Sequence, residues 1–350
     1  MILHSEPRSG AMTEISISCD GRDSYSEFQE KVAASENSGA AAIWIANHLF
    51  QRDPISLAAM ALAQTKRTRL ALMAMSPLTM HPVQAAMSAA TLDEFFPGRV
   101  TLCLGVGTPG DLKSVGIEAE KPLRIMRDAL ELARALLAGE TVRVDGEFFS
   151  VQGRRLGTGA RPVPLVLAAS GPRMLELAGA AADGVLLSAG TSIEFVKQSL
   201  ERVNYAAKGR PVRSHALVYA AVDEDETLAH DRLRRVLAIV LRGSHHAPNL
   251  RQGGSSLDQS ALNEAVMAED WSRAEALITD DIVRRHAASG RPEQMRQRFT
   301  AYQAAGLDEI VVAGVRDVMP AECHPGRPGP VCARSGAVWR DNTGAGRCAG

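Results

Sequence analysis

The sequence predicts a (β/α)8 TIM barrel, α/β in class, with a helical insertion between strands seven and eight and an irregular C-terminal tail. Three observations predict it. Short apolar runs alternate with helical patterns along most of the 350-residue chain. The runs are apolar almost throughout, which is typical of parallel strands covered by helices. Eight such runs can be counted, and that number favours a closed barrel over an open sheet.

The first half of the chain supplies four strand–helix units. Asp23 is expected near the N-cap of the first helix, and Gly39 at its end. Pro54 and Pro82 stand where a first helical turn accepts proline without losing a hydrogen bond. We expect strands at 14–20, 41–48, 68–77 and 99–104, with helices at 23–39, 53–67, 81–98 and 122–140.

The second half continues the alternation with two additions. The segment 142–162 contains too many glycines for a helix and predicts an irregular hairpin. The segment 244–290 predicts a mostly helical insertion, with a loop at the Gly/Ser stretch 251–256. The remaining strands are expected at 163–170, 183–190, 213–225 and 309–315, and the remaining helices at 171–182, 191–209, 226–243 and 292–308.

The pattern defines one domain between two flanking segments. Residues 14–318 form the expected barrel domain, and residues 1–13 are a short leader. The segment 319–350 contains four prolines and six glycines and has neither helical nor alternating periodicity. It cannot supply the outer helix that should follow the eighth strand. We therefore expect a disordered tail, or one that belongs to a different reading frame.

Composition argues against several classes of partner. A formal net charge of −1 gives no bulk attraction for nucleic acid or anionic membranes. No apolar run approaches the roughly 18–20 residues that cross a bilayer, and the first twelve residues lack the apolar core of a signal peptide. The five cysteines show no zinc-site spacing, so we expect no metal. A cytoplasmic protein with reduced, buried Cys19 and Cys103 is predicted.

The stretch 99–110, RVTLCLGVGTPG, places Gly105, Gly107 and Gly110 in the spacing G-x-G-x-x-G. A dinucleotide site needs a helix that starts at once and an acidic residue about twenty positions on, at a strand end. Here a loop of about a dozen residues follows, and the region twenty positions on is helical. The glycines instead predict a strand end that a flat ligand can approach closely, with a merely flexible turn as the alternative.

Two other strand ends carry groups with useful chemistry. His48 ends the second strand, and a structural role and a functional role are equally compatible with this position. Ser170 and Gly171 end the fifth strand and begin a helix, whose free N–H groups and neighbouring hydroxyl suit an anion. An ordinary N-cap is the alternative there. In a barrel, ligands bind at these C-terminal strand ends.

Three segments resemble the bacterial luciferase-like superfamily of flavin- and deazaflavin-dependent oxidoreductases: IWIANHLFQRDP, HPVQAAMSAATLDEFFPGRVTLCLGVG and AASGPRMLELAGAAADGVLL. The segment 104–130 is most similar to the methylenetetrahydromethanopterin reductases, which use the deazaflavin coenzyme F-420. The resemblance covers about residues 14–316. It implies a (β/α)8 barrel with an insertion between strands seven and eight and a cofactor ring lying across the strand ends.

The resemblance also implies roles for particular residues. Asn47 and His48 match a pair beside the ring and the substrate, which makes them the catalytic candidates. Ser170 and Gly171 match the loop that holds the cofactor phosphate. The other expected cofactor-binding residues are Gly105 and Gly107, at the open end of the fourth strand, and Met73 and Ala74, where the family carries a non-proline cis peptide bond beneath the ring.

Two positions depart from the family pattern. Many members carry Asp or Glu where Asn47 stands, so an acidic proton donor is absent there. The luciferase subgroup carries Arg where Val106 stands, which argues against a bioluminescent reaction. Beyond Val315 the resemblance stops.

The expected function is an oxidoreductase in which reduced coenzyme F-420 passes hydride to a small organic substrate. His48 would hydrogen-bond or transfer a proton, because an imidazole pKa near 6.5 suits that task. An FMN-dependent monooxygenase of the same superfamily is the first alternative. A catalytically silent barrel with an incomplete C-terminus is the second, motivated by the tail. We also consider a homodimer.

Overall fold

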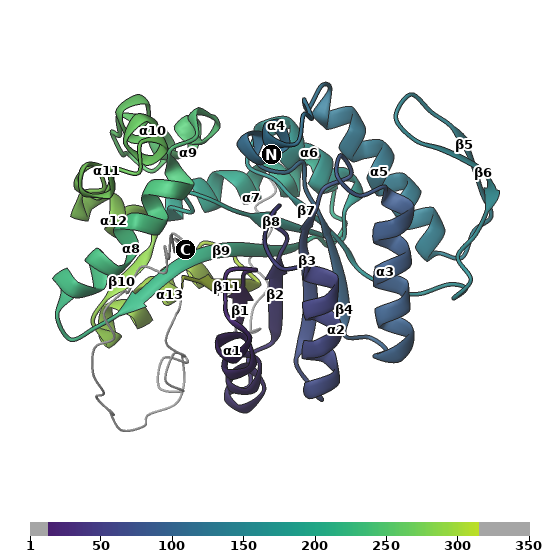
Figure 1. The fold of residues 1–350 in the computed structure, drawn as a ribbon, viewed down its shortest axis with the longest axis horizontal. Coiled ribbons are helices and arrows are strands. Elements are labelled where there is room, and N and C mark those ends of the chain that lie inside the picture. The colour runs from purple at the N-terminus through teal and green to yellow at the C-terminus, as the bar shows by residue number, and fades with distance from the viewer. Residues whose placement is uncertain (1–12, 315–350) are drawn as a thin grey trace, which may run out of the picture.

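The computed structural model describes residues 13–314, in which helices lie around a set of parallel strands (Figure 1). The pairing of the strands closes them into a ring. Around the ring the order is β1, β2, β3, β4, β7, β8, β9 and β11, and β11 pairs back to β1. This closure confirms the predicted (β/α)8 barrel. The strands are β1 (Glu14–Cys19), β2 (Ala42–Ala46), β3 (Arg69–Met75), β4 (Val100–Leu104), β7 (Leu165–Ala168), β8 (Gly184–Leu187), β9 (Arg213–Val222) and β11 (Glu309–Ala313).

The outer helices begin where local capping groups satisfy their first N–H groups. The first helix is capped by Ser24, the residue after Asp23, and Ser24 and Glu27 form a reciprocal capping box. Pro54 and Pro82 open their helices as expected. The helices are α1 (Tyr25–Ser38), α2 (Pro54–Gln64), α3 (Pro82–Phe95), α5 (Pro122–Leu137), α6 (Pro172–Ala181), α7 (Ile193–Ala207) and α13 (Pro292–Ala304).

Two segments of the chain lie outside the ring of strands and its outer helices. The predicted hairpin is present as β5 (Val142–Asp145) and β6 (Ser150–Arg154), which project from the body (Figure 1). The predicted insertion is also helical, and it shares a small apolar core with α8. Its elements, with the preceding helix, are α8 (Glu226–Leu241), η1 (Ser244–His246), α9 (Ala247–Gln252), α10 (Gln259–Met267), α11 (Trp271–Leu277) and α12 (Asp280–His286).

Two short elements were not predicted. The segment after the glycine cluster, expected to be a loop, contains the short helix α4 (Pro109–Ser114), which Pro109 opens. Residues Ala288–Gly290 form β10, which extends the sheet beside the end of β9. Both elements are too short to show a periodicity in the sequence.

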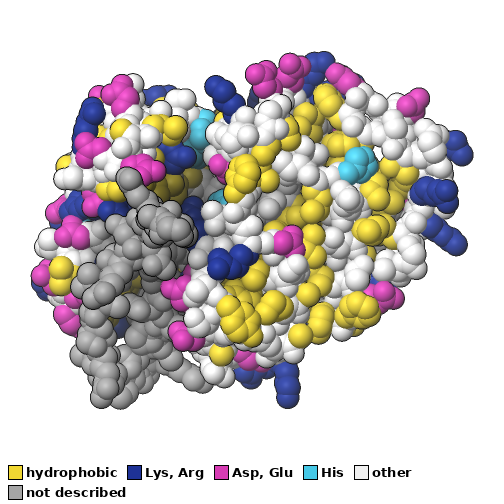
Figure 2. Space-filling model, viewed as in Figure 1, with side chains coloured by type: hydrophobic (Ala, Val, Ile, Leu, Met, Phe, Trp, Pro, Cys, Tyr) yellow, Lys and Arg dark blue, Asp and Glu magenta, His cyan; other side chains and the backbone are white. Residues whose placement is uncertain are grey.

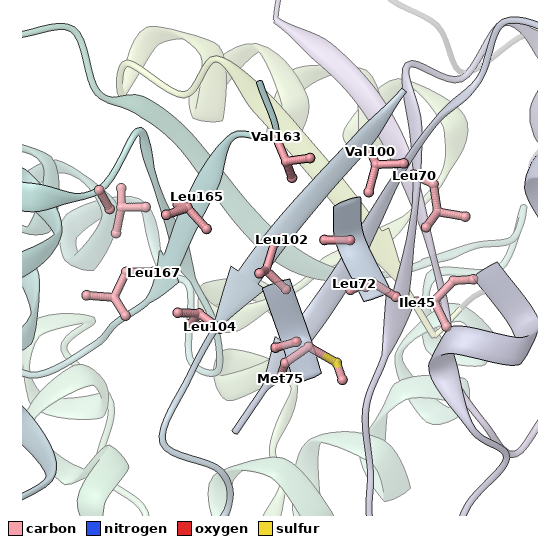
Figure 3. Packing of buried hydrophobic residues seen from close by; sticks show 14 of the residues in the cluster. Ile45, Leu70, Leu72, Met75, Val100, Leu102, Leu104, Val163, Leu165 and Leu167 are labelled. Atoms are coloured by element: carbon pink, nitrogen blue, oxygen red, sulfur yellow. The ribbon is translucent and has the colours of Figure 1, made fainter. Parts of the chain in front are cut away.

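Strand side chains divide between two apolar layers. Outward-facing residues such as Leu72, Leu102 and Leu167 pack in the layer between sheet and helices (Figure 3). The barrel interior is lined instead by a second cluster, in which Trp44 is the only aromatic residue. Its buried members are Ala42, Trp44, Ala46, Ala71, Met73, Cys103, Val166, Leu186 and Val311. Most of these side chains are small, so the single Trp fills much of the space.

The N-terminal end of the barrel is occupied by a buried carboxylate. Glu309 is 1% exposed and accepts hydrogen bonds from the Ser16 hydroxyl (2.5 Å) and the Trp44 indole (2.7 Å). Its other oxygen lies 3.2 Å from His215 Nδ1 and 3.2 Å from the Arg213 guanidinium. Burial opposes ionisation, but His215, Ser16 and Trp44 hold the pKa of Glu309 to about 2.

Several expectations fall partly or wholly outside the described residues. All but the last residue of the expected leader 1–13, and the whole tail 319–350, lie there. Within residues 13–314, no helix is long and apolar enough to cross a membrane. The same residues contain no group of three or more side chains placed to hold a metal ion.

Candidate functional site

The residues predicted for the site lie on four consecutive strands of the ring. Asn47 and His48 follow β2, Met73 and Ala74 lie near the end of β3, and Gly105 follows β4. Gly107 also follows β4, and Ser170 and Gly171 follow β7. Because all strands of the ring are parallel, these positions meet at one C-terminal edge. The structure therefore brings all eight residues to one arc of the barrel mouth.

The centre of the arc carries almost no side chains. A Cβ atom built on Gly105 would lie 2.8 Å from the Ala74 Cβ and 3.3 Å from the Ala168 Cβ. Glycine is thus required here by its close approach to two alanines on the flanking strands. Ala74 and Ala168 are themselves only half-buried. Together the three residues form a surface of small groups at the mouth, which we call the platform.

The backbone beside the platform is irregular in β3. The peptide bond between Met73 and Ala74 is cis, which confirms the expectation for this position. The pairing of β3 with β4 shifts by one residue between Leu72 and Met75. The Asn47 side-chain amide reaches across to the Ala74 carbonyl at 3.5 Å. The end of β2 is therefore joined to the irregular part of β3.

The second glycine of the cluster has a different role from the first. Gly107 adopts a φ of +98°, a conformation that other residues rarely adopt. The chain turns there from β4 into α4, and the Ser76 hydroxyl supports the turn by donating to the Val106 carbonyl at 2.6 Å. Gly107 is exposed, so this turn lies at the surface of the mouth.

The β2 side of the mouth is polar and charged. His48 is half-buried, and burial together with the charge of Arg22 lowers its pKa. Arg22 lies in the loop after β1, which Arg52 ties to the β2 loop by donating to the Gly21 carbonyl at 2.8 Å. A lowered pKa keeps the His48 imidazole neutral near pH 7, with one nitrogen able to donate and the other to accept a hydrogen bond.

Sequence reasoning missed several charged or polar residues near His48. Asp20, at the end of β1, and Asp111, in α4, both act electrostatically on His48. Tyr219, on β9, is influenced by the same Arg22 and Asp20, and burial raises its pKa to about 12. The rule used for His48, that polar residues at strand ends face the mouth, would have found Asp20. Tyr219 sits inside a long apolar strand and gave no such signal.

The β7 side of the mouth presents hydroxyl and N–H groups. Gly171 is the N-cap of α6 and supplies no side-chain cap, and a Cβ built on it would meet open space. Ser170 is half-buried, as is Ser188 at the end of the adjacent strand β8. Within residues 13–314, neither hydroxyl has a hydrogen-bond partner. Sequence reasoning named Ser170 but missed Ser188.

Comparison with known proteins identifies the family. The family model described as luciferase-like monooxygenase matches residues 2–309. The chain belongs to the luciferase-like monooxygenase family. This membership confirms the expected superfamily and the expectation of an enzyme.

Relatives of the chain include reductases and dehydrogenases. The 5,10-methylenetetrahydromethanopterin reductase of Archaeoglobus fulgidus is 31% identical over 296 residues, which cover 82% of this chain and 89% of that protein. A coenzyme F-420-dependent glucose-6-phosphate dehydrogenase of Beutenbergia cavernae is 30% identical, over 72% of this chain and 74% of that protein. The solved coenzyme F-420-dependent tetrahydromethanopterin reductase of Methanopyrus kandleri has a similar fold, with a TM-score of 0.78 at 22% identity over 86% of this chain and 93% of that one.

Proposed function

We propose that this protein is an oxidoreductase that binds coenzyme F-420 at the barrel mouth and transfers hydride between it and a small organic substrate. The observation that carries the proposal is the order of groups along the arc. Charged and polar side chains lie at β1 and β2, and the platform lies at β3, β4 and β7. The Ser170 and Ser188 hydroxyls, which have no partner within residues 13–314, lie at β7 and β8. A molecule with a flat ring and a phosphate-bearing tail has the matching order of parts.

The residues present fit such a cofactor. A planar ring needs a surface without long side chains, and Ala74, Gly105 and Ala168 provide one. Ser170 and the first N–H groups of α6 would hold a phosphate, since helix N-termini carry partial positive charge. When bound, the deazaflavin supplies two-electron hydride chemistry, and the protein supplies orientation and exclusion of water.

We assign the polar side of the mouth to the substrate. His48 would orient the acceptor by a hydrogen bond and move a proton at an imidazole nitrogen, which its lowered pKa leaves neutral near pH 7. Asn47 would hold the β2 and β3 ends in register through its contact with the Ala74 carbonyl. The F-420-dependent glucose-6-phosphate dehydrogenase named above supports this cofactor by its own activity.

An FMN-dependent monooxygenase is the second candidate, favoured by the family description itself. The same platform accepts either ring. Equilibrium titration of the purified protein with F-420 and with FMN, each followed by fluorescence, separates the two. Binding of F-420 in the micromolar range, with FMN at least about tenfold weaker, supports the first proposal; the reverse order supports the second. Binding of neither leaves the catalytically silent barrel and rejects both.

We further propose that the protein forms a homodimer through α2 and α3 and works in the cytoplasm. Hydrophobic side chains gather on the face that carries these helices (Figure 2). Met87 and Phe95 on α3 are 53% and 69% exposed, and the exposed residues Ser56, Ala59 and Ala63 of α2 are small and uncharged. A second copy of the same face would bury them. Light scattering should show a dimer that the double variant Met87→Arg, Phe95→Arg converts to monomer; an unchanged mass would reject this face.

A further inference from the structure

The loop between β8 and α7 lies where the barrel meets the helical insertion. It begins with Ser188, whose hydroxyl has no partner among residues 13–314, and continues through four buried residues to α7. Ala189 and Gly190 both adopt left-handed conformations, with φ of 59° and 66°. Such a conformation is unfavourable for Ala189, which has a Cβ atom, and persists only where the surroundings enforce it.

The barrel fixes only the second half of this loop. The Thr191 hydroxyl donates to the Leu217 carbonyl of β9 at 3.0 Å, and the Tyr302 hydroxyl of α13 donates to the Thr191 carbonyl at 2.6 Å. These contacts hold the approach to α7. They do not reach Ala189, the residue next to Ser188.

The insertion fixes the first half. The Asn249 side chain in α9, 2% exposed, donates to the Ala189 carbonyl at 3.0 Å. A Cβ built on Gly190 would lie 3.4 Å from the Asn249 Cβ and 3.7 Å from His286 Nδ1. The buried His286 ring is in turn oriented by Ser255, whose hydroxyl lies 2.8 Å from Nε2. The left-handed pair is therefore held from outside the barrel.

We propose that Asn249 is a positioning residue for the phosphate-bearing tail of the cofactor. By holding the Ala189 carbonyl it sets the place of Ser188 beside Ser170, so that two hydroxyls from adjacent strands face one anion. The insertion then acts on cofactor affinity without contacting the ring. This inference rests on the proposed function, because it assigns the tail to the β7 and β8 ends.

The test compares two ligands that share a ring and differ in the tail. Affinities of wild type and Asn249→Ala are measured by fluorescence for F-420 and for its deazaflavin riboside, which lacks the phosphate tail. We expect Asn249→Ala to weaken F-420 about tenfold or more and the riboside less than about twofold. Asn263→Ala is the matched control, an exposed asparagine of the same insertion without a partner among the described residues, and should change neither.

The outcomes separate this inference from the proposed function. Equal weakening of both ligands by Asn249→Ala, or weakening of neither, overturns the positioning role while the cofactor assignment stands. FMN and riboflavin form a second pair of ligands that differ by a phosphate. If wild type binds none of the four ligands, both the proposed function and the positioning role are rejected. If wild type prefers FMN, the FMN-to-riboflavin comparison makes the same test.

A measurement on the wild type covers the case in which Asn249→Ala does not fold. Hydrogen exchange of peptides that contain residues 247–252 is followed with F-420 and with the riboside. Slower exchange with F-420 alone supports coupling between the insertion and the tail site. Equal exchange with both ligands overturns it.

Discussion

Replacing Glu309 by Gln should destabilise the barrel without touching the candidate site. The carboxylate lies at the opposite end of the strands, accepts hydrogen bonds from Ser16 and Trp44, and faces His215 and Arg213. Its pKa falls from 4.5 to about 2 in the folded protein. At about 1.36 kcal/mol per pKa unit, this difference corresponds to about 3 kcal/mol of stability at pH 7.

The sign of the pH dependence follows from the depressed pKa. Above the unfolded value of 4.5 the ionised carboxylate contributes its full stabilisation, and this contribution is lost as pH falls toward about 2. At pH 3 the difference between wild type and Glu309→Gln should have dropped to about half of its value at pH 7 or less. Other carboxylates titrate in both proteins, so the difference between them isolates Glu309.

The measurement is urea unfolding followed by circular dichroism at pH 7 and pH 3. Glu14→Gln is the matched control, because Glu14 pairs with the same Arg213 but its side chain is 41% exposed. An exposed pair contributes about 1 kcal/mol or less. The reasoning is refuted if the two variants lose the same stability at pH 7, or if the effect of Glu309→Gln does not shrink at pH 3.

Three further results are expected. Gly105→Val should lower the free energy of unfolding by about 1–3 kcal/mol through overpacking against Ala74 and Ala168, and it should abolish cofactor binding. The control Gly110→Ala, whose new Cβ meets nothing within 4 Å, should do neither. Normal cofactor binding by Gly105→Val would show that the platform is not part of the site. His48→Ala should reduce turnover more than about tenfold with unchanged cofactor affinity, and full turnover would exclude His48 from proton transfer. Cys19 and Cys103 should resist alkylation in the native protein, because burial raises the pKa of Cys19 to about 12 and that of Cys103 above its usual value. Mass spectrometry maps the modified cysteines, and modification at the rate of an unfolded control would contradict the prediction.

The fold was predictable because its signals are local. Pro54, Pro82 and Gly39 mark helix ends by their own backbone chemistry, and apolar strands are readable one at a time. Closure followed from counting strands. The short helix α4 was not predictable, because six residues carry no helical period beyond the proline that opens them.

Residues of the candidate site could be proposed from the sequence only where a strand end stood beside a recognisable motif. Asn47, Gly105 and Ser170 each lie next to one. Tyr219 reaches the same mouth from a strand about 170 residues later in the chain than His48, and only ring closure brings β9 and β11 round to β1. The proposed role of Asn249 was even harder to predict from the sequence, because it depends on the conformation of Ala189 and not on a pattern of residues around Asn249.

The two ends of this barrel carry opposite kinds of polar group. At the N-terminal end every atom of the Glu309 carboxylate has partners, and buried charge is tolerated because it is paired. At the C-terminal end Ser170 and Ser188 have none among residues 13–314. A polar group without a partner loses free energy on burial unless a ligand supplies the missing hydrogen bonds. The Glu309 carboxylate is therefore satisfied within the protein, whereas the Ser170 and Ser188 hydroxyls are available to a ligand.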